Sequence, residues 1–147
     1  MHNSPRRKRA RIQERIAAAF VALGCLTLLA TAAGLSPSED GHGTHHQLGL
    51  PPCGFLSVTG HPCATCGMTT AYAHAANADL IEAARIQPAG MLLAVLTAAG
   101  FWAAGHVALF GSMLGRQVGR MLGSKALILG GGIIAAAWAY KLWVGVG

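Results

Sequence analysis

Three of the four cysteines lie between residues 53 and 66, where their spacing could support chemistry. Cys63 and Cys66 belong to a Cys-Ala-Thr-Cys-Gly run, and Cys53 stands upstream of it. Cysteines at such spacings can share a metal ion, act as a redox pair, or form disulfides. Gly67 permits a tight turn directly after the pair. The spacing leaves these three interpretations open.

Zinc is the metal that this segment would suit, because a structural zinc ion takes four sulfur or nitrogen ligands. The candidate ligands are three cysteines and a nearby histidine: Cys53, Cys63, Cys66 and His61. Other histidines upstream could replace His61, since short His-rich tracts can bind metal: His42, His45 and His46. The cofactor stays unassigned, with zinc as the candidate.

Thiol chemistry without a metal is the alternative. A thiolate near a helix N-terminus is stabilised by unpaired amides and the helix dipole, and the sequence predicts a helix directly after Cys66. Cys63 and Cys66 could exchange thiols and disulfides, or form a disulfide that, together with Cys53, only staples the loop to this helix. Thioredoxin-like pairs follow a strand in an alternating α/β domain, and this sequence shows no such alternation.

No catalytic residue is predicted. The sequence contains no Ser/His/Asp array and no Gly-rich phosphate-binding loop. Asp79 and Glu82 lie three positions apart on a predicted helix, where two solvent-facing acids are commoner than a catalytic dyad. The pattern therefore favours a protein that is not an enzyme.

The composition indicates a membrane protein. Of the 147 residues, 53% are hydrophobic and 11% are charged, whereas a soluble domain carries about 25% charged residues. The mean hydropathy is +0.47. The net charge of +6 is concentrated near the N-terminus and in one short loop, which is typical of a topology signal rather than of a nucleic-acid-binding face.

The chain divides into alternating apolar and polar segments. Apolar blocks of about 20 residues can cross a bilayer, and three predicted transmembrane helices have this length: 16–35, 88–110 and 126–146. The connecting segments are a basic tail, an outer loop with the Cys-rich turn, a helix, and a basic Gly-rich inner loop: 1–15, 36–66, 67–87 and 111–125. We expect an all-α membrane protein with three spans, the lipid bilayer as its environment, and a membrane protein or a second copy as its partner.

The segment 67–87 predicts an interfacial or re-entrant amphipathic helix that Pro88 ends. Its charges make a full-depth span unfavourable. Glu82 and Arg85 are spaced to pair on one helix face. Cys25 lies in the first apolar block and is expected to pack there as a small hydrophobe.

The charge distribution predicts the orientation. Segments 1–15 and 111–125 are basic, whereas 36–87 has one arginine and four acids. The positive-inside rule places the N-terminus in the cytoplasm and the cysteine loop outside, which indicates a multi-pass membrane protein. Residues 1–32 also resemble a cleavable signal peptide, but the long apolar run favours an uncleaved span.

The run from Thr59 to Ala71, Thr-Gly-His-Pro-Cys-Ala-Thr-Cys-Gly-Met-Thr-Thr-Ala, resembles domain of unknown function family 2752. Its pattern is Thr-Gly-x-Pro-Cys-Pro-x-Cys-Gly-x-Thr-Arg, then a helix, then Asn-Pro. This sequence departs from that pattern at Ala64, Thr70 and Gln87. The resemblance implies a small bacterial membrane protein, which we expect in the inner membrane, with a cysteine-centred outer site. It implies no activity.

These features predict a non-enzymatic integral membrane component whose outward cysteine module is structural or metal-binding. The alternative is a membrane enzyme that handles thiols, disulfides or metal through Cys63 and Cys66.

Overall fold

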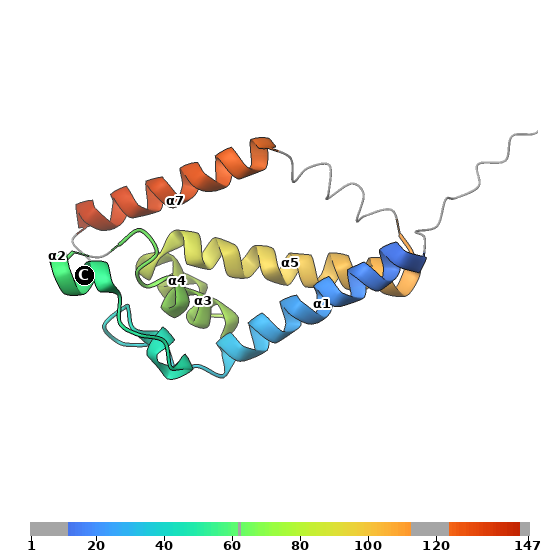
Figure 1. Ribbon diagram of the computed structural model, residues 1–147, viewed down its shortest axis with the longest axis horizontal. Helices are drawn as coiled ribbons and strands as arrows, with labels where there is room; N and C mark the ends of the chain where they lie inside the picture. Colours follow the sequence, from blue (N-terminus) through green and yellow to red (C-terminus); the bar gives the residue numbers. More distant parts are fainter. Residues whose placement is uncertain (1–11, 62, 113–123, 145–147) are drawn as a thin grey trace, which may run out of the picture.

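The computed structural model describes residues 12–61, 63–112 and 124–144, and all regular structure within these ranges is helical (Figure 1). The elements are α1 (Ile12–Ala33), the 3₁₀ helix η1 (Thr44–Leu48), α2 (Gly54–Thr59), α3 (Met68–Ala76), α4 (Leu80–Ile86), α5 (Pro88–Phe110) and α7 (Ser124–Val144). The prediction of an all-α protein is confirmed for the described residues.

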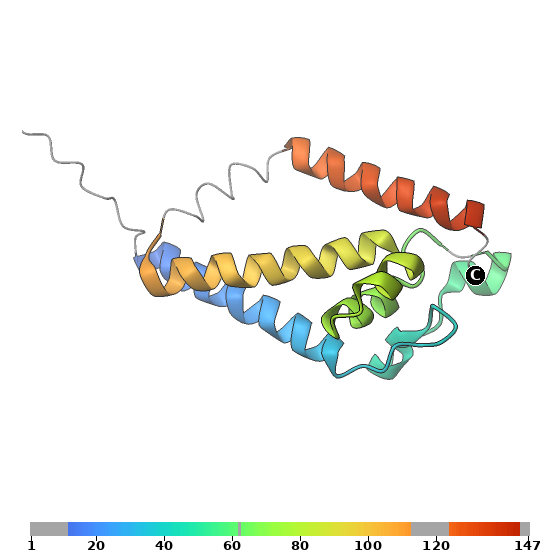
Figure 2. The same ribbon diagram turned by 180° about the vertical axis from the view of Figure 1, so that it is seen from behind.

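The long helices α1 and α5 pack side by side and run in opposite directions (Figures 1 and 2). At one end, the Arg15 guanidinium donates hydrogen bonds of 2.9 and 3.1 Å to the carbonyls of Ala108 and Leu109. Midway, Cys25 faces Gly100, where an added methyl group would lie 3.7 Å from the sulfur. Cys25 therefore packs between the helices, as expected from the sequence.

Two helices are long and apolar enough to cross a membrane: α1 with 22 residues and α5 with 23. Pro88 occupies the first turn of α5, where its missing N–H costs nothing, and Gly111 ends the helix with a φ of 64°. In α7, the apolar part Ile128–Tyr140 is shorter. By length and composition, the described residues thus contain two helices that could span a membrane and one shorter apolar helix. The predicted number of three spans is therefore not confirmed.

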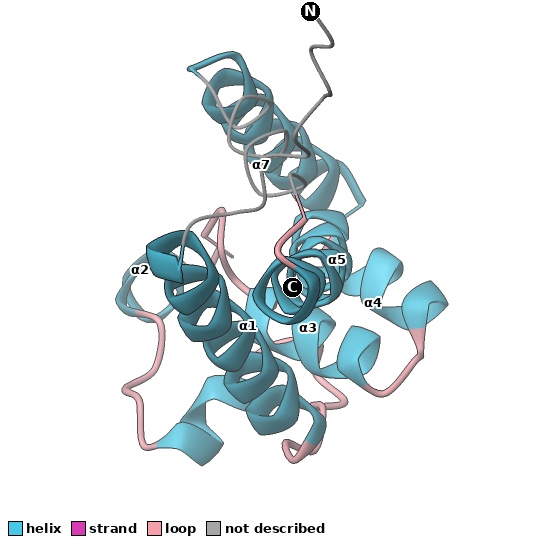
Figure 3. Ribbon diagram, turned by 90° about the vertical axis from the view of Figure 1, so that its right-hand side faces the viewer, coloured by secondary structure: helices cyan, strands magenta, loops and turns pink. Residues whose placement is uncertain are grey.

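The helix α7 lies along α5 on the side away from α3 and runs back toward α2 (Figures 1 and 2). Viewed end-on, α3 and α4 lie beside α5, and α7 stands apart from them (Figure 3). Among the described residues, the main packing of α7 is against α5. The C-terminal end of α7 and the segment from η1 to α4 therefore occupy the same end of the molecule.

The elements η1 to α4 form a folded module at the start of α5, and we call the described residues between Ser36 and Gln87 the cysteine module. Its apolar centre is formed by Ala71, Ala83 and Ile86. A methyl group added at Gly90 of α5 would lie 2.8 Å from the Met68 carbonyl oxygen. The start of α3 therefore contacts the backbone of α5 at a point where only glycine fits.

The predicted single helix 67–87 is two helices, α3 and α4. The Asn77 side chain donates to the Ala73 carbonyl at 2.9 Å and ends α3. Asp79 then caps α4 by accepting the Glu82 N–H at 3.3 Å. Between them, Ala78 has a φ of 66°. Asn and Asp compete with helical hydrogen bonding in this way, which divides the segment.

Two further boundaries differ from the prediction. The predicted loop 36–66 contains η1 and α2, and α1 begins at Ile12 rather than at residue 16. Most of the predicted basic tail and inner loop falls at residues 1–11 and 113–123, which lie outside the described residues.

Candidate cysteine site

The sulfur atoms of Cys53 and Cys63 lie 3.4 Å apart, with the Cys53 thiol donating to the Cys63 sulfur. Cys53 immediately precedes α2, and its carbonyl accepts the Ser57 N–H at 3.0 Å. The helix ends at Gly60, whose φ of 70° reverses the chain. The short helix α2 and the turn at Gly60 therefore bring Cys63 back beside Cys53.

Cys63 lies in a polar, partly exposed position. Its sulfur is 3.4 Å from the Thr65 hydroxyl, and its carbonyl accepts the Cys66 N–H at 3.0 Å in a tight turn. Burial raises the pKa of the Cys63 thiol, but hydrogen bonds from the Thr65 hydroxyl, Cys53 and the Thr65 and Cys66 amides outweigh it, so the pKa is lowered from 9.0. Hydrogen bonds favour the thiolate because they stabilise its charge.

Cys66 occupies a different environment from Cys63. Its side chain is 7% exposed, and it is followed by Gly67, whose φ of 76° precedes the first turn of α3. Cys63 and Cys66, the predicted redox or disulfide pair, share a backbone turn. The sulfur–sulfur contact that the structure shows joins Cys63 to Cys53 instead.

The predicted zinc site is brought together only in part. Nδ1 of His61 lies 2.9 Å from the Thr59 carbonyl. A carbonyl can only accept, so this nitrogen is the donor and is not available as a metal ligand in this arrangement. Within the described residues, no three His, Cys, Asp or Glu side chains are grouped so that they could hold a metal ion. The four-ligand set of Cys53, Cys63, Cys66 and His61 stays a prediction.

The upstream histidines contact their own loop. In each histidine, one ring nitrogen lies 2.8 to 3.2 Å from a backbone carbonyl. The pairs are His42 with Asp40, His45 with Pro51, and His46 with Leu50. These nitrogens are donors for the same reason as in His61. The three side chains thus brace the loop around η1.

Gln87 anchors the cysteine turn to the start of α5. Its side chain is fully buried, and Nε2 donates to the Ala64 carbonyl at 2.8 Å. Ala64 lies between the two cysteines of the motif, so this bond holds the turn from the side opposite Cys53. Sequence reasoning noted Gln87 only as a departure from the family pattern. No local signal connects residues 23 positions apart.

Thr70 joins α3 to η1. Its hydroxyl lies 2.8 Å from that of Thr44, and both side chains are buried. The Thr44 hydroxyl also accepts the Ser38 N–H at 3.0 Å. In the sequence, Thr70 stands where the family pattern has arginine. In the structure it is an internal hydrogen-bonding partner.

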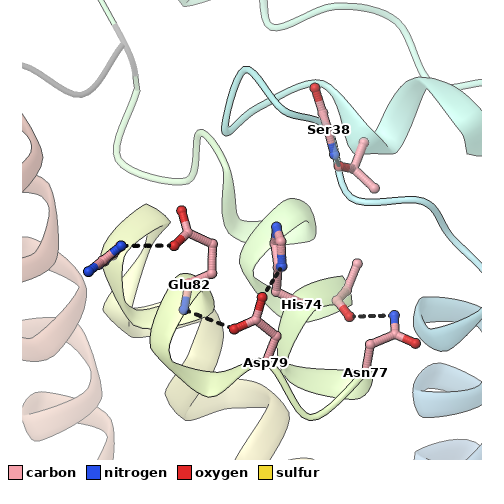
Figure 4. Close-up of polar contacts among 8 residues, drawn as sticks. Ser38, His74, Asn77, Asp79 and Glu82 are labelled. Atoms are coloured by element: carbon pink, nitrogen blue, oxygen red, sulfur yellow. Dashed lines mark hydrogen bonds and ion pairs between the residues drawn. The ribbon is translucent and has the colours of Figure 1, made fainter.

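Two acidic residues of the module, Asp79 and Glu82, lie at the start of α4 (Figure 4). Asp79 accepts the Glu82 N–H and lies 3.1 Å from Nδ1 of His74. The predicted pair of Glu82 and Arg85 is present at 3.4 Å. Asp79 and Glu82 are therefore a helix cap and half of an exposed ion pair.

The fold and site define a small helical protein with two helices of membrane-spanning length and a folded, cysteine-bearing module at one end. Residues 53–102 match the family described as "Protein of unknown function (DUF2752)". The resemblance indicated by the motif is therefore confirmed over this segment, from Cys53 to the middle of α5. No curated protein and no solved structure matches the chain.

Proposed function

We propose that this protein is a non-enzymatic component of a bacterial inner membrane, with α1, α5 and α7 as its three spans and the cysteine module as a structural cap outside. The observation that carries this proposal is the exposure of large apolar side chains along the long helices. Phe20 is 70% exposed in α1, Trp102 is 74% exposed in α5, and Ile128 is 74% exposed in α7. A bilayer would cover such surfaces.

The arrangement of the helices supports the orientation. Arg15, near the start of α1, contacts the end of α5, so the basic segments 1–15 and 111–125 attach to helix ends at the same side. The cysteine module lies at the opposite side with the acids Asp79 and Glu82 (Figure 1). By the positive-inside rule, the first side faces the cytoplasm.

The module offers a contact surface for a membrane protein partner or a second copy of the chain. Phe55 and Val58 of α2 are 49% and 87% exposed, close to the cysteine turn. The buried threonine pair holds η1 on α3, and Gln87 holds the cysteine turn at the start of α5. An exposed apolar patch beside the membrane suits an assembly role better than a catalytic one.

Labelling with a membrane-impermeant maleimide–polyethylene glycol tests the orientation. An added cysteine at exposed Glu39 (E39C) should give one more gel shift than the native chain in intact spheroplasts. An added cysteine at Ser4 (S4C) should do so only in inverted vesicles. Extra labelling of S4C in spheroplasts, or of E39C only in inverted vesicles, would overturn the orientation.

A further inference from the structure

We propose that Cys53 and Cys63 form a disulfide by exchange with an external disulfide, and that Cys63 is the thiol that reacts first. The inference deepens the proposed function, since it rests on the cysteine module facing an oxidising compartment. Its geometric basis is the 3.4 Å contact between the two sulfurs, on segments joined through the short helix α2.

The two thiols differ in a way that assigns their order. Cys53 donates its hydrogen to the Cys63 sulfur, and Cys63 also lies 3.4 Å from the Thr65 hydroxyl. The Cys63 sulfur is thus surrounded by donors, which favours its thiolate, and the thiolate is the attacking form in exchange. Cys53 is the donor in this contact, so its sulfur is placed to attack second.

The exchange proceeds in two displacements. The Cys63 thiolate attacks one sulfur of an external disulfide, forms a mixed disulfide and releases a thiolate that takes up a proton. Cys53 then loses its proton to solvent, and its thiolate attacks the Cys63 sulfur and releases the second external thiol. Two protein thiols are oxidised and one external disulfide is reduced to two thiols.

The other cysteines are placed where exchange is disfavoured. Cys66 is 7% exposed, so an external disulfide reaches it less easily than Cys63. Cys25 lies between α1 and α5, beside Gly100. The two remaining sulfurs are therefore shielded by the module and by the helix pair respectively.

The disulfide would close a loop that contains all of α2. Gln87 already ties the cysteine turn to α5 through the Ala64 carbonyl. A covalent link from Cys63 to Cys53 extends this connection to α2, so the exposed Phe55 and Val58 become fixed relative to the membrane helices. Reduction would release α2 while leaving the threonine pair and Gln87 in place.

The test uses full-length protein purified in mild detergent without chelator, reduced, freed of reductant and exposed to oxidised glutathione. Remaining thiols are alkylated, and the chain is cut with chymotrypsin. Cleavage after Phe55 and Tyr72 separates Cys53 from the peptide that holds Cys63 and Cys66. We expect a cross-linked peptide pair, with Cys66 alkylated in the fragment spectrum.

Three variants establish the order of reaction. C53S should stop at a stable glutathione adduct on Cys63, and C63S should form the adduct at least tenfold more slowly. The matched control C66S should form the cross-link at the native rate. The native cross-link itself requires no variant to fold, so the proposal stays testable if one of them is unstable.

Several outcomes would overturn the proposal. They are a Cys63–Cys66 link within one peptide, a native chain that keeps all thiols free, or a bound zinc ion that protects the thiols until chelation. Because the reaction is followed in detergent, it measures the pairing and not the orientation. Failure here leaves the labelling result in vesicles unaffected, and the reverse also holds.

Discussion

The cysteine module and the long helices differ in how far their apolar side chains are buried. In the module, Ala71, Ala73 and Ala83 are fully buried by other parts of the chain. In α1, by contrast, only Ala32 is buried, and Leu23 is 60% exposed. The centre of the module is thus covered by other parts of the chain, whereas the apolar side chains of α1 are largely left uncovered. The same degree of exposure should therefore have different consequences in the two regions.

The largest expected effect comes from a charge on the exposed face of α1. Leu23→Arg should cost about 3 kcal/mol of membrane insertion, since arginine at the centre of a spanning helix is disfavoured by this amount. The measurement is the amount of full-length chain in the membrane fraction. Ile81→Arg in α4 is the matched control, because Ile81 is 73% exposed but belongs to the module. Equal losses for both variants would contradict the difference between the regions.

The next effect concerns the contact between the module and α5. Gly90→Ala should lower the free energy of unfolding by about 2 kcal/mol, because the new methyl group meets the Met68 carbonyl oxygen at 2.8 Å. Thermal unfolding in detergent measures this loss. Gly105→Ala, where no neighbouring atom lies within 4 Å, should be neutral or gain up to about 1 kcal/mol in helix propensity. A stable Gly90→Ala variant would mean that α3 can move off α5.

A smaller loss is expected from Gln87→Leu. The substitution leaves the Ala64 carbonyl without its buried donor, which should cost about 1 kcal/mol, and maleimide should then react faster with Cys66. Gln47 provides a comparison, because its amide also donates to a backbone carbonyl, that of Ser36, at 2.6 Å, but from an exposed position in η1. Gln47→Leu should leave Cys66 reactivity unchanged. If both variants behave alike, Gln87 does not anchor the turn.

The smallest effect is a pH dependence at Cys63. Its lowered pKa predicts that alkylation by iodoacetamide rises with pH around a lower midpoint in the folded chain than in the unfolded chain. Thr65→Ala should raise that midpoint by removing a hydroxyl donor. The associated stability is present above the unfolded pKa and is lost as the pH falls through the folded pKa. Identical midpoints in native and Thr65→Ala proteins would exclude a role for the hydroxyl.

The sequence was sufficient for features that depend on composition and local pattern. Long apolar blocks predicted the helices α1 and α5, and the spacing of Glu82 and Arg85 predicted their ion pair. The run Asn77-Ala-Asp79 also carried a local signal, since Asn and Asp commonly end and begin helices. That signal was overlooked when a single helix was predicted.

The internal arrangement of the site could not be predicted in this way. The contact of Cys53 with Cys63 depends on where α2 stops, and Gln87 meets Ala64 across the whole of α3 and α4. Such contacts are chosen by tertiary packing rather than by neighbouring residues. The familiar Cys-x-x-Cys spacing drew attention to Cys63 and Cys66, whereas the contact shown is to the cysteine outside that motif.

The hydrogen bonds between Arg15 and the end of α5 have a consequence for biosynthesis. Its partners, Ala108 and Leu109, are made 93 and 94 residues after Arg15. At about 5–20 residues per second, the ribosome needs at least several seconds to supply them. During this interval water and lipid headgroups must solvate the guanidinium. In the proposed topology, α1 therefore enters the membrane before α5 is made. The contact of Arg15 with the end of α5 can form only after the whole cysteine module has been translated.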